Sequence, residues 1–485
     1  MRKCSFLFVL LLLSNISFGQ QTQFTKELES LQHFFSIPGM TAAITQNNKL
    51  IYEQHFGYAD LETKTLVNAN TIFPVASITK LFTATLIMKL AAQGKLVLND
   101  PISLYIPNSK LDKQIQIQHL LSHTSQGTIG KQFFYSVRFS LLTQIIEKAT
   151  GKPFNEVMNS EILTPLKLTN TFLLKNKQQL TQAKETIATP YVLGNGVEKG
   201  FIDYGYSTSA GLVSNTKDLL QFSKALDQNS ILSTASKNKL LQGIDNDLPY
   251  AFGIFKQRYL ETDIFWIYGQ YDCYSSLLLK VPSKKLTLVL LANNNLMSDP
   301  ARLIMGDVTS SLFAMSFLKN YVLNSPQTPL LETAEEVYTN NATNTSFYRK
   351  KVLAQALANS FMARFDLKHF QTSKVLLEKT FEKHPNYLAY TDINLLHTLV
   401  FLKDVAFYKK LPPFTQFDTQ IEHIGTTLLK ETPNDPYLHS YMATFYDRNG
   451  NLKKAKQHYK TIVTLPNFSS NWYTKDAAQW LEEHP

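Results

Sequence analysis

The order of elements along the chain predicts an α/β (α+β) domain followed by an all-α domain with repeat-like helices. Strand-like segments rich in β-branched and aromatic residues occur within residues 40–56 and again within residues 251–292. A largely helical block lies between them, at residues 100–240. Beyond residue 346 the sequence has helical patterning and no strand signal. We therefore expect a mixed antiparallel sheet, built from distant segments, with a helical region inserted between its strands.

Turn and breaker residues limit the individual elements. A helix at residues 25–35 precedes two strands within residues 40–56, which a turn at Gln46-Asn47-Asn48 joins. Further helices are expected at residues 116–122, 136–150, 153–163, 216–228 and 301–322. Further strands are expected at residues 251–255, 263–268, 274–281 and 286–292.

Residues 1–19 have the pattern of a secretory signal peptide. A basic start precedes an apolar centre at residues 6–13 and a small-residue cleavage site before Gln20. The apolar run is too short for a membrane span, although an uncleaved anchor remains the alternative. Cleavage removes Cys4 and leaves Cys273 alone, which excludes an intramolecular disulfide. We predict a bacterial periplasmic or secreted protein with no stable membrane span after cleavage.

Length and composition indicate at least two globular domains. The chain has 485 residues, of which 44% are hydrophobic and 18% charged. We predict domains at residues 20–323 and 347–485, joined by a polar linker at residues 324–346. The net charge of +10 comes from scattered lysines, without the clustered basic stripe that nucleic-acid binding requires. We therefore expect no nucleic-acid partner.

The second domain contains one segment with the spacing of a tetratricopeptide hairpin. In residues 435–467, Ala443 and Ala455 stand where two helices approach closely. A weaker copy spans residues 354–385. Because such repeats generally form protein contacts, the helical domain predicts a protein partner.

A serine and a lysine three residues apart mark the candidate active site. Ser77 lies at a turn before a strongly apolar helix, and Lys80 follows one turn later on the same face. A lysine in a buried helix is either a base with a lowered pKa, able to activate the serine, or a cross-link of the helix. The same spacing recurs in settings that we interpret as surface or capping serines: Ser214/Lys217, Ser236/Lys239 and Ser316/Lys319.

The wider sequence resembles the serine β-lactamase-related hydrolases, a family of class C β-lactamases, D,D-peptidases, D-aminopeptidases and esterases. The resemblance rests on Phe73-Pro-Val-Ala-Ser-Ile-Thr-Lys80 and on collinear segments at residues 94–107, 117–125, 209–222 and 274–282. It implies a β-lactamase/transpeptidase-like domain. It also implies that Ser77 is the acylated nucleophile and Lys80 its general base.

The family's other two motifs are present in altered form. Tyr135-Ser136-Val137 stands in the place of a Tyr-x-Asn motif, which implies that Tyr135 is a proton shuttle that loses its proton more readily beside a cation. Valine cannot make the hydrogen bonds of the usual asparagine. Tyr268-Gly269-Gln270 stands in the place of Lys-Thr-Gly or His-x-Gly and implies the substrate-binding residues. The backbone N–H groups of Ser77 and Tyr271 would form the oxyanion hole.

Three further residues invite a functional interpretation. His119 and His123 lie four apart, but no third ligand is evident, so we interpret both as structural histidines. Cys273 is expected to be a small buried residue near the site, because no histidine partner can be assigned. We predict neither a metal nor a cofactor.

Two functions remain open. The first is an exported serine hydrolase that acts through a Ser-Lys acyl-enzyme on esters or on small acylated or peptide-like substrates. The second is a catalytically degraded binding or scaffold protein whose helical domain contacts other proteins. Val137, Tyr268 and Gln270 favour the second, whereas the intact Ser77/Lys80 pair favours the first.

Overall fold

The computed structural model describes residues 19–182, 186–301, 303–323, 346–383, 392–468 and 471–485, and a few residues between 325 and 336. The predicted signal peptide lies almost wholly outside them. No helix in the described ranges is both long enough and apolar enough to cross a membrane.

A seven-stranded sheet with the order β3-β2-β1-β12-β11-β10-β9 forms the centre of the first domain. Its strands are β1 (Gly39–Gln46), β2 (Lys49–Asp60), β3 (Thr65–Leu66), β9 (Phe255–Tyr259), β10 (Thr262–Tyr271), β11 (Tyr274–Val281) and β12 (Leu286–Ala292). Each strand pairs with its neighbours antiparallel, so the sheet is antiparallel throughout rather than mixed. The pairing of β1 with β12 joins the two distant segments, as the sequence predicts.

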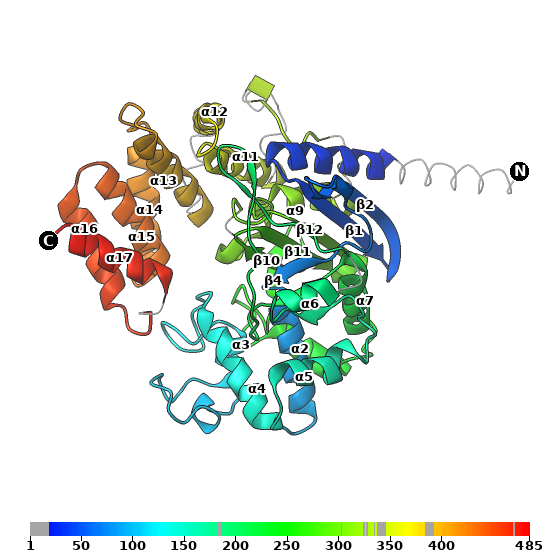
Figure 1. Ribbon diagram of the computed structural model, residues 1–485. Coiled ribbons are helices and arrows are strands. Elements are labelled where there is room, and N and C mark those ends of the chain that lie inside the picture. The colour runs from blue at the N-terminus through cyan, green and yellow to red at the C-terminus, as the bar shows by residue number, and fades with distance from the viewer. Residues whose placement is uncertain are drawn as a thin grey trace, which may run out of the picture.

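Alternating side chains place one hydrophobic core on each face of the sheet. Along β12, Leu288 and Leu290 face a core shared with the helix at residues 19–34, whereas Val289 and Leu291 face a core shared with α2 (Thr79–Ala92). Figure 1 shows these two helices on opposite sides of the sheet. The expected α/β domain with an inserted helical region is thereby confirmed.

The inserted region surrounds α2 with short helices and two small sheets. Its helices are α3 (Ile117–Leu121), α4 (Leu142–Thr150), α5 (Phe154–Met158), α6 (Lys177–Gln182), α7 (Thr216–Asp227) and α8 (Thr234–Gln242). The small sheets are β4-β8-β5 (Phe73–Ala76, Leu212–Ser214, Phe172–Leu173) and β6-β7 (Tyr191–Leu193, Val197–Lys199). The predicted helices at 116–122, 136–150, 153–163 and 216–228 all correspond to helical segments.

Two predicted elements are wrong, in each case at a glycine with positive φ. Residues 251–254 form a loop instead of a strand, because Gly253 has φ of +72° and lies against the Lys80 carbonyl. The expected helix at residues 301–322 is broken at Gly306, with φ of +81°. The chain makes a single 3₁₀ turn before this break, at Leu303–Met305, and another after it, at Val308–Ser310, which α9 (Leu312–Phe317) follows.

Two of the serines interpreted as surface or capping residues are buried. Ser316 is fully buried, and its hydroxyl donates to Glu27 Oε2 at 2.6 Å. Ser214 is also buried and shares a hydrogen bond of 2.8 Å with Thr171. Ser236 is half-buried near the start of α8, where Ser233 is the capping residue.

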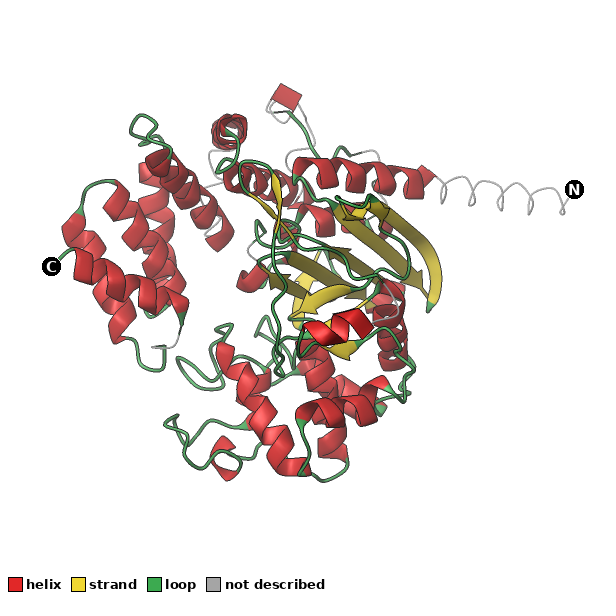
Figure 2. Cartoon of the chain, in the orientation of Figure 1, coloured by secondary structure: helices red, strands yellow, loops and turns green. Residues whose placement is uncertain are grey.

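The C-terminal region is helical throughout its described residues (Figure 2). Its helices are α11 (Ser346–Met362), α12 (Leu367–Lys383), α13 (Ile393–Tyr408), α14 (Asp418–Glu431), α15 (Pro436–Arg448), α16 (Leu452–Thr464) and α17 (Trp472–Glu483). Helices α15 and α16 pack as a hairpin with Ala443 and Ala455 fully buried. The assignment to tetratricopeptide repeats stays a prediction. Within the predicted linker, Glu332 is buried and paired with Lys351 of α11.

Candidate active site

The turn between β4 and α2 presents Ser77. Ala76 has a positive φ of 43°, a conformation that costs free energy in a residue other than glycine and that turns the chain sharply. Thr79 stabilises the turn, because its hydroxyl donates to the Ala76 carbonyl at 2.6 Å and accepts from the Leu212 N–H at 3.1 Å. Ser77 is thus the one partly exposed residue between Thr71 and Met88.

Lys80 lies beside the Ser77 hydroxyl, as its spacing predicts. Its Nζ is 2.8 Å from Ser77 Oγ and donates to the Ser209 carbonyl at 2.9 Å. Lys80 is 3% exposed, and it bonds no carboxylate among the residues that the structure describes. Burial lowers the pKa of Lys80 to about 7. A substantial fraction of this amine is therefore neutral near pH 7 and able to accept a proton.

Tyr135 reaches the same serine from the segment before α4. Its side chain hydrogen-bonds Ser77, and Lys80 Nζ lies 5.0 Å from the centre of its ring. Burial raises the pKa of Tyr135 above its ordinary value, and the hydrogen bond to Ser77 offsets only part of this shift. The expectation that this phenol loses its proton readily is therefore wrong. The arrangement instead suits a neutral phenol that donates and relays a proton.

Aromatic rings enclose Tyr135 on the side away from the cleft. The rings of His123 and Phe255 lie 4.3 Å and 6.0 Å from its ring. His123 accepts the Ser136 N–H at Nδ1, which assigns its own proton to Nε2. Burial, and secondly Lys80, lower the pKa of His123 well below its ordinary value, so this ring is neutral. Its structural interpretation agrees with these contacts.

An open cleft of about 670 Å³ lies in front of Ser77. Tyr268, Gln270 and Tyr271 of β10 line it, so three of the four β10 residues predicted for the site face the cleft. Gly269 instead lies against the Val75 carbonyl, where a Cβ would come within 2.1 Å of the oxygen. This glycine therefore lets β10 cross β4 closely.

The oxyanion hole stays a prediction at both of its expected donors, the N–H groups of Ser77 and Tyr271. The Ser77 N–H donates to no acceptor among the residues that the structure describes, so it is available to a substrate oxygen. Tyr271 closes the pairing of β10 with β11, opposite Tyr274, at the rim of the cleft. Its N–H stays the predicted second donor.

Val137 does not enter the cleft. It is 63% exposed at the start of a short helical turn, Val137–Leu141. The Ser209 carbonyl supplies a hydrogen-bond acceptor for Lys80 in a site that lacks the usual asparagine. Ser209 lies in a family-like segment of the sequence but has no predicted role, since a backbone carbonyl leaves no residue-type signal.

The loop at residues 203–210 and the turn at Asp272 form the wall of the cleft that sequence reasoning missed. Asp203, Tyr204 and Tyr206 line it opposite Ser77, together with Asp272. Burial, and then the Asp272 carboxylate, raise the pKa of Asp203. Among the described residues that line this cleft, none is a lysine, an arginine or a histidine.

The remaining candidates have structural surroundings. His119 accepts the Gln116 N–H at 3.0 Å and so caps α3. Cys273 is 1% exposed and accepts the Phe201 N–H in the tight turn between β10 and β11, in agreement with a small buried residue. Within the described ranges, no group of three or more histidine, cysteine or acidic side chains is arranged to hold a metal ion.

Comparisons with known proteins connect this geometry to one family. The sequence pattern of the Beta-lactamase family matches residues 28–304. "Protein flp" of Staphylococcus aureus (strain N315) is 27% identical over 320 residues, which cover 57% of this chain and 63% of that protein. A "Beta-lactamase" of Pseudomonas fluorescens is 27% identical over 227 residues, 40% of this chain and 61% of its own length. The chain thus spans less than two thirds of these relatives.

Two solved structures share the fold. The octameric penicillin-binding protein homologue from Pyrococcus abyssi superposes with a TM-score of 0.56 and 22% identity, over 63% of this chain and 78% of its own. The D-amino acid amidase from Ochrobactrum anthropi SV3 superposes with a TM-score of 0.50 and 19% identity, over 57% of this chain and 92% of its own. The match to the family pattern spans more than half of the sequence and includes the Ser77 turn. This chain therefore belongs to the Beta-lactamase family.

Proposed function

We propose that this protein is a serine hydrolase that forms an acyl-enzyme at Ser77. The observation that carries the proposal is the 2.8 Å contact between Ser77 Oγ and a buried Lys80 amine whose pKa is lowered to about 7. A serine hydroxyl is a poor nucleophile until a neighbouring base accepts its proton. Lys80 meets that need near neutral pH.

The proposed reaction has two proton-coupled steps. Neutral Lys80 accepts the Ser77 proton while Ser77 Oγ bonds to the substrate carbonyl carbon and the Ser77 N–H stabilises the oxyanion. Tyr135 then gives its proton to the leaving group, and the proton that Lys80 took from Ser77 restores the phenol. Water attacks the acyl-enzyme with the same base, and the free acid leaves.

The cleft supports esters or small acylated substrates that carry no carboxylate near the reacting carbonyl. Asp203 and Asp272 line it, and Tyr268 stands where the family has a cationic or imidazole side chain. A negatively charged substrate group would meet these two acidic side chains without a compensating cation in the lining. Neutral or ammonium-bearing acyl compounds fit this wall better.

The proposal is tested by hydrolysis of p-nitrophenyl esters with the full chain. We expect turnover by the wild type and its loss in Ser77→Ala. Persistence of the same rate in Ser77→Ala would contradict acylation at this serine. We also propose export through the signal peptide at residues 1–19, which N-terminal sequencing of the protein recovered from the periplasm would test by locating cleavage before Gln20.

The second candidate function is a degraded, non-catalytic scaffold. The exposed Val137, which leaves the site without the usual asparagine, is the observation that favours it. The helical C-terminal region would then be its partner-binding part. Ester turnover that depends on Ser77 contradicts this alternative, whereas absence of turnover with an intact fold supports it.

A further inference from the structure

The C-terminal region contacts the segment that carries Tyr135. Gln126 donates from Nε2 to the Asn467 carbonyl at 2.7 Å and to Asn471 Oδ1 at 3.2 Å. Asn467 and Asn471 belong to the connection between α16 and α17. A loop of the inserted helical region and a loop more than 300 residues later are thus joined beside the candidate active site.

Arg138 forms hydrogen bonds to both of these loops. Its guanidinium donates from Nη1 to the Ser125 carbonyl at 2.6 Å and from Nη2 to the Asn467 carbonyl at 2.8 Å. The side chain is 7% exposed. A buried guanidinium that loses an acceptor carries a large desolvation penalty, so the C-terminal loop satisfies a charged group of the first domain.

An apolar contact accompanies these hydrogen bonds. Phe134 packs edge-on against Phe468, with 4.9 Å between the ring centres. The two rings belong to one small core with α15, α16 and α17, whose other buried members are Tyr437, Ile462, Tyr473 and Ala477. Phe134, directly before Tyr135, is therefore held by the C-terminal region.

The backbone on both sides of Tyr135 is fixed at His123. The Phe134 N–H donates to the His123 carbonyl at 2.9 Å, and the Ser136 N–H donates to His123 Nδ1 at 3.0 Å. Because Phe134 and Arg138 flank this short stretch, contacts at Asn467 and Phe468 constrain where the Tyr135 hydroxyl lies.

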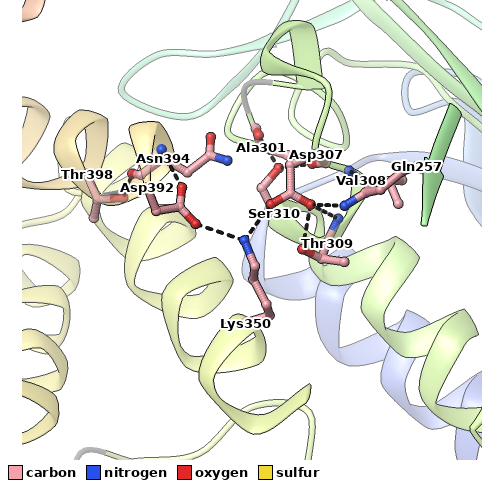
Figure 3. Close-up of polar contacts among 10 residues, drawn as sticks. All are labelled: Gln257, Ala301, Asp307, Val308, Thr309, Ser310, Lys350, Asp392, Asn394 and Thr398. Carbon is pink, nitrogen blue, oxygen red and sulfur yellow. Dashed lines mark hydrogen bonds and ion pairs between the residues drawn. The ribbon is translucent and has the colours of Figure 1, made fainter. Parts of the chain in front are cut away.

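A second connection reaches Tyr135 through the edge of the sheet. Lys350 of α11 pairs with Asp307 and Asp392, each at 2.8 Å (Figure 3). Asp307 accepts from Gln257 Nε2 at 2.7 Å, and Gln257 lies on β9. Phe255 of the same strand stacks on the Tyr135 ring with 3° between the ring planes.

We propose that the C-terminal helical region positions Tyr135. This region would then contribute to the active site and would not be a separate docking module. The role given to Tyr135 rests on the proposed hydrolase function. Asn467 and Phe468 hold the segment before α4, and Lys350 holds the strand behind the Tyr135 ring. Phe468, Arg138 and Lys350 are positioning residues, since none of them lines the cleft.

A double-mutant experiment in the full chain tests this proposal. The rate at which a fluorophosphonate probe phosphonylates the protein is measured by intact mass for Phe468→Ala and Lys350→Met, in the wild-type and in the Tyr135→Phe background. We expect each substitution to lower the rate about tenfold when Tyr135 is present. Without the Tyr135 hydroxyl, neither should lower it further. An equal decrease in both backgrounds, or no decrease in either, would overturn the proposal.

Matched variants separate positioning from general loss of stability. Phe445→Ala removes a buried ring inside the C-terminal core, and Lys454→Met removes an ion pair with Glu422 within that region. Both should leave the phosphonylation rate unchanged. A decrease equal to that of Phe468→Ala or Lys350→Met would show that any damage to the region has the same effect.

Hydrogen exchange supplies a readout that does not depend on activity. Amides of residues 123–139 should exchange faster in Phe468→Ala than in the wild type, whereas Ser77→Ala should leave them unchanged. Unchanged exchange in Phe468→Ala overturns the positioning role. A wild type that never acylates, yet shows the faster exchange in Phe468→Ala, contradicts the proposed hydrolase while retaining the structural coupling.

Discussion

Two Ser-x-x-Lys pairs in this molecule have the same spacing and opposite surroundings. Ser77/Lys80 opens onto a cleft, and the Lys80 amine bonds the serine hydroxyl and a backbone carbonyl. Ser316/Lys319 lies deep in the core beneath the sheet, where both side chains bond the carboxylate of Glu27. The spacing is therefore the same, but the first pair has no carboxylate in its described contacts.

This difference decides what each lysine can do. Burial lowers the pKa of both amines, but Glu27 opposes that shift at Lys319. An ion pair holds a lysine in its charged form and ties up its protons, so Lys319 stabilises the fold. Lys80 bonds no carboxylate among the described residues, which suits the base that we propose.

The largest expected effect separates the two serines by activity. Ser77→Ala should lower kcat/KM for a p-nitrophenyl ester by about 10⁴-fold or more, because it removes the nucleophile. Ser316→Ala should leave kcat/KM unchanged and lower the free energy of unfolding by about 1–3 kcal/mol, since it removes a buried hydrogen bond to a carboxylate. Steady-state kinetics and urea unfolding provide the two measurements. Equal loss of activity in both variants would contradict a catalytic role for Ser77 alone.

Substitution of the two lysines should likewise affect activity at Lys80 and stability at Lys319. Lys80→Met should lower kcat/KM about 10²- to 10⁴-fold through loss of the base. Lys319→Met leaves the Glu27 carboxylate buried without its cation and should destabilise the fold by about 3–5 kcal/mol. Thermal unfolding monitored by circular dichroism measures the second effect. A Lys319→Met protein as stable as the wild type would contradict the structural role of this pair.

The pH dependence of kcat/KM sharpens the assignment of the base. In the proposed mechanism the neutral form of Lys80 is the active one. Because burial lowers its pKa to about 7, kcat/KM should rise as pH increases through about 7 and level off above it. A pH series with a neutral ester measures this, and Ser316→Ala should give the same midpoint. A profile that falls with pH over this range would exclude Lys80 as the base.

The smallest expected effect concerns the acidic wall of the cleft. Asp272→Asn should weaken the preference for an ammonium-bearing ester over a neutral ester of equal size by about two- to fivefold, as is typical of a partly exposed charge. The ratio of the two kcat/KM values measures this preference. Asp263→Asn, which changes an exposed acid in a surface ion pair on β10, the strand that ends just before Asp272, is the control and should leave the ratio unchanged. If Asp272→Asn leaves the ratio unchanged, the Asp272 carboxylate does not favour ammonium-bearing substrates.

Periodicity predicted the elements that lie in the cores. The strands from Tyr274 to Ala292 and the buried helix after Ser77 appear close to their expected limits, because alternation and an all-apolar run report burial directly. The Ser77/Lys80 contact was also predictable, since a three-residue separation in a helix places two side chains on one face.

Other features depend on contacts that local sequence does not encode. Ser316 appeared to be a surface or capping residue, because its partner Glu27 is 289 residues away. Burial of Tyr135 by rings from distant segments reversed the expected direction of its pKa shift. The Ser209 carbonyl and the Asn467 contact are backbone interactions, which leave no residue-type signal.

Peptide mapping of a fluorophosphonate adduct tests the central claim most directly. Intact mass should show one adduct on the wild type, and the mapped peptide should place it at Ser77. Ser316→Ala should be labelled like the wild type, and Ser77→Ala should not be labelled. An adduct that persists in Ser77→Ala would contradict the account.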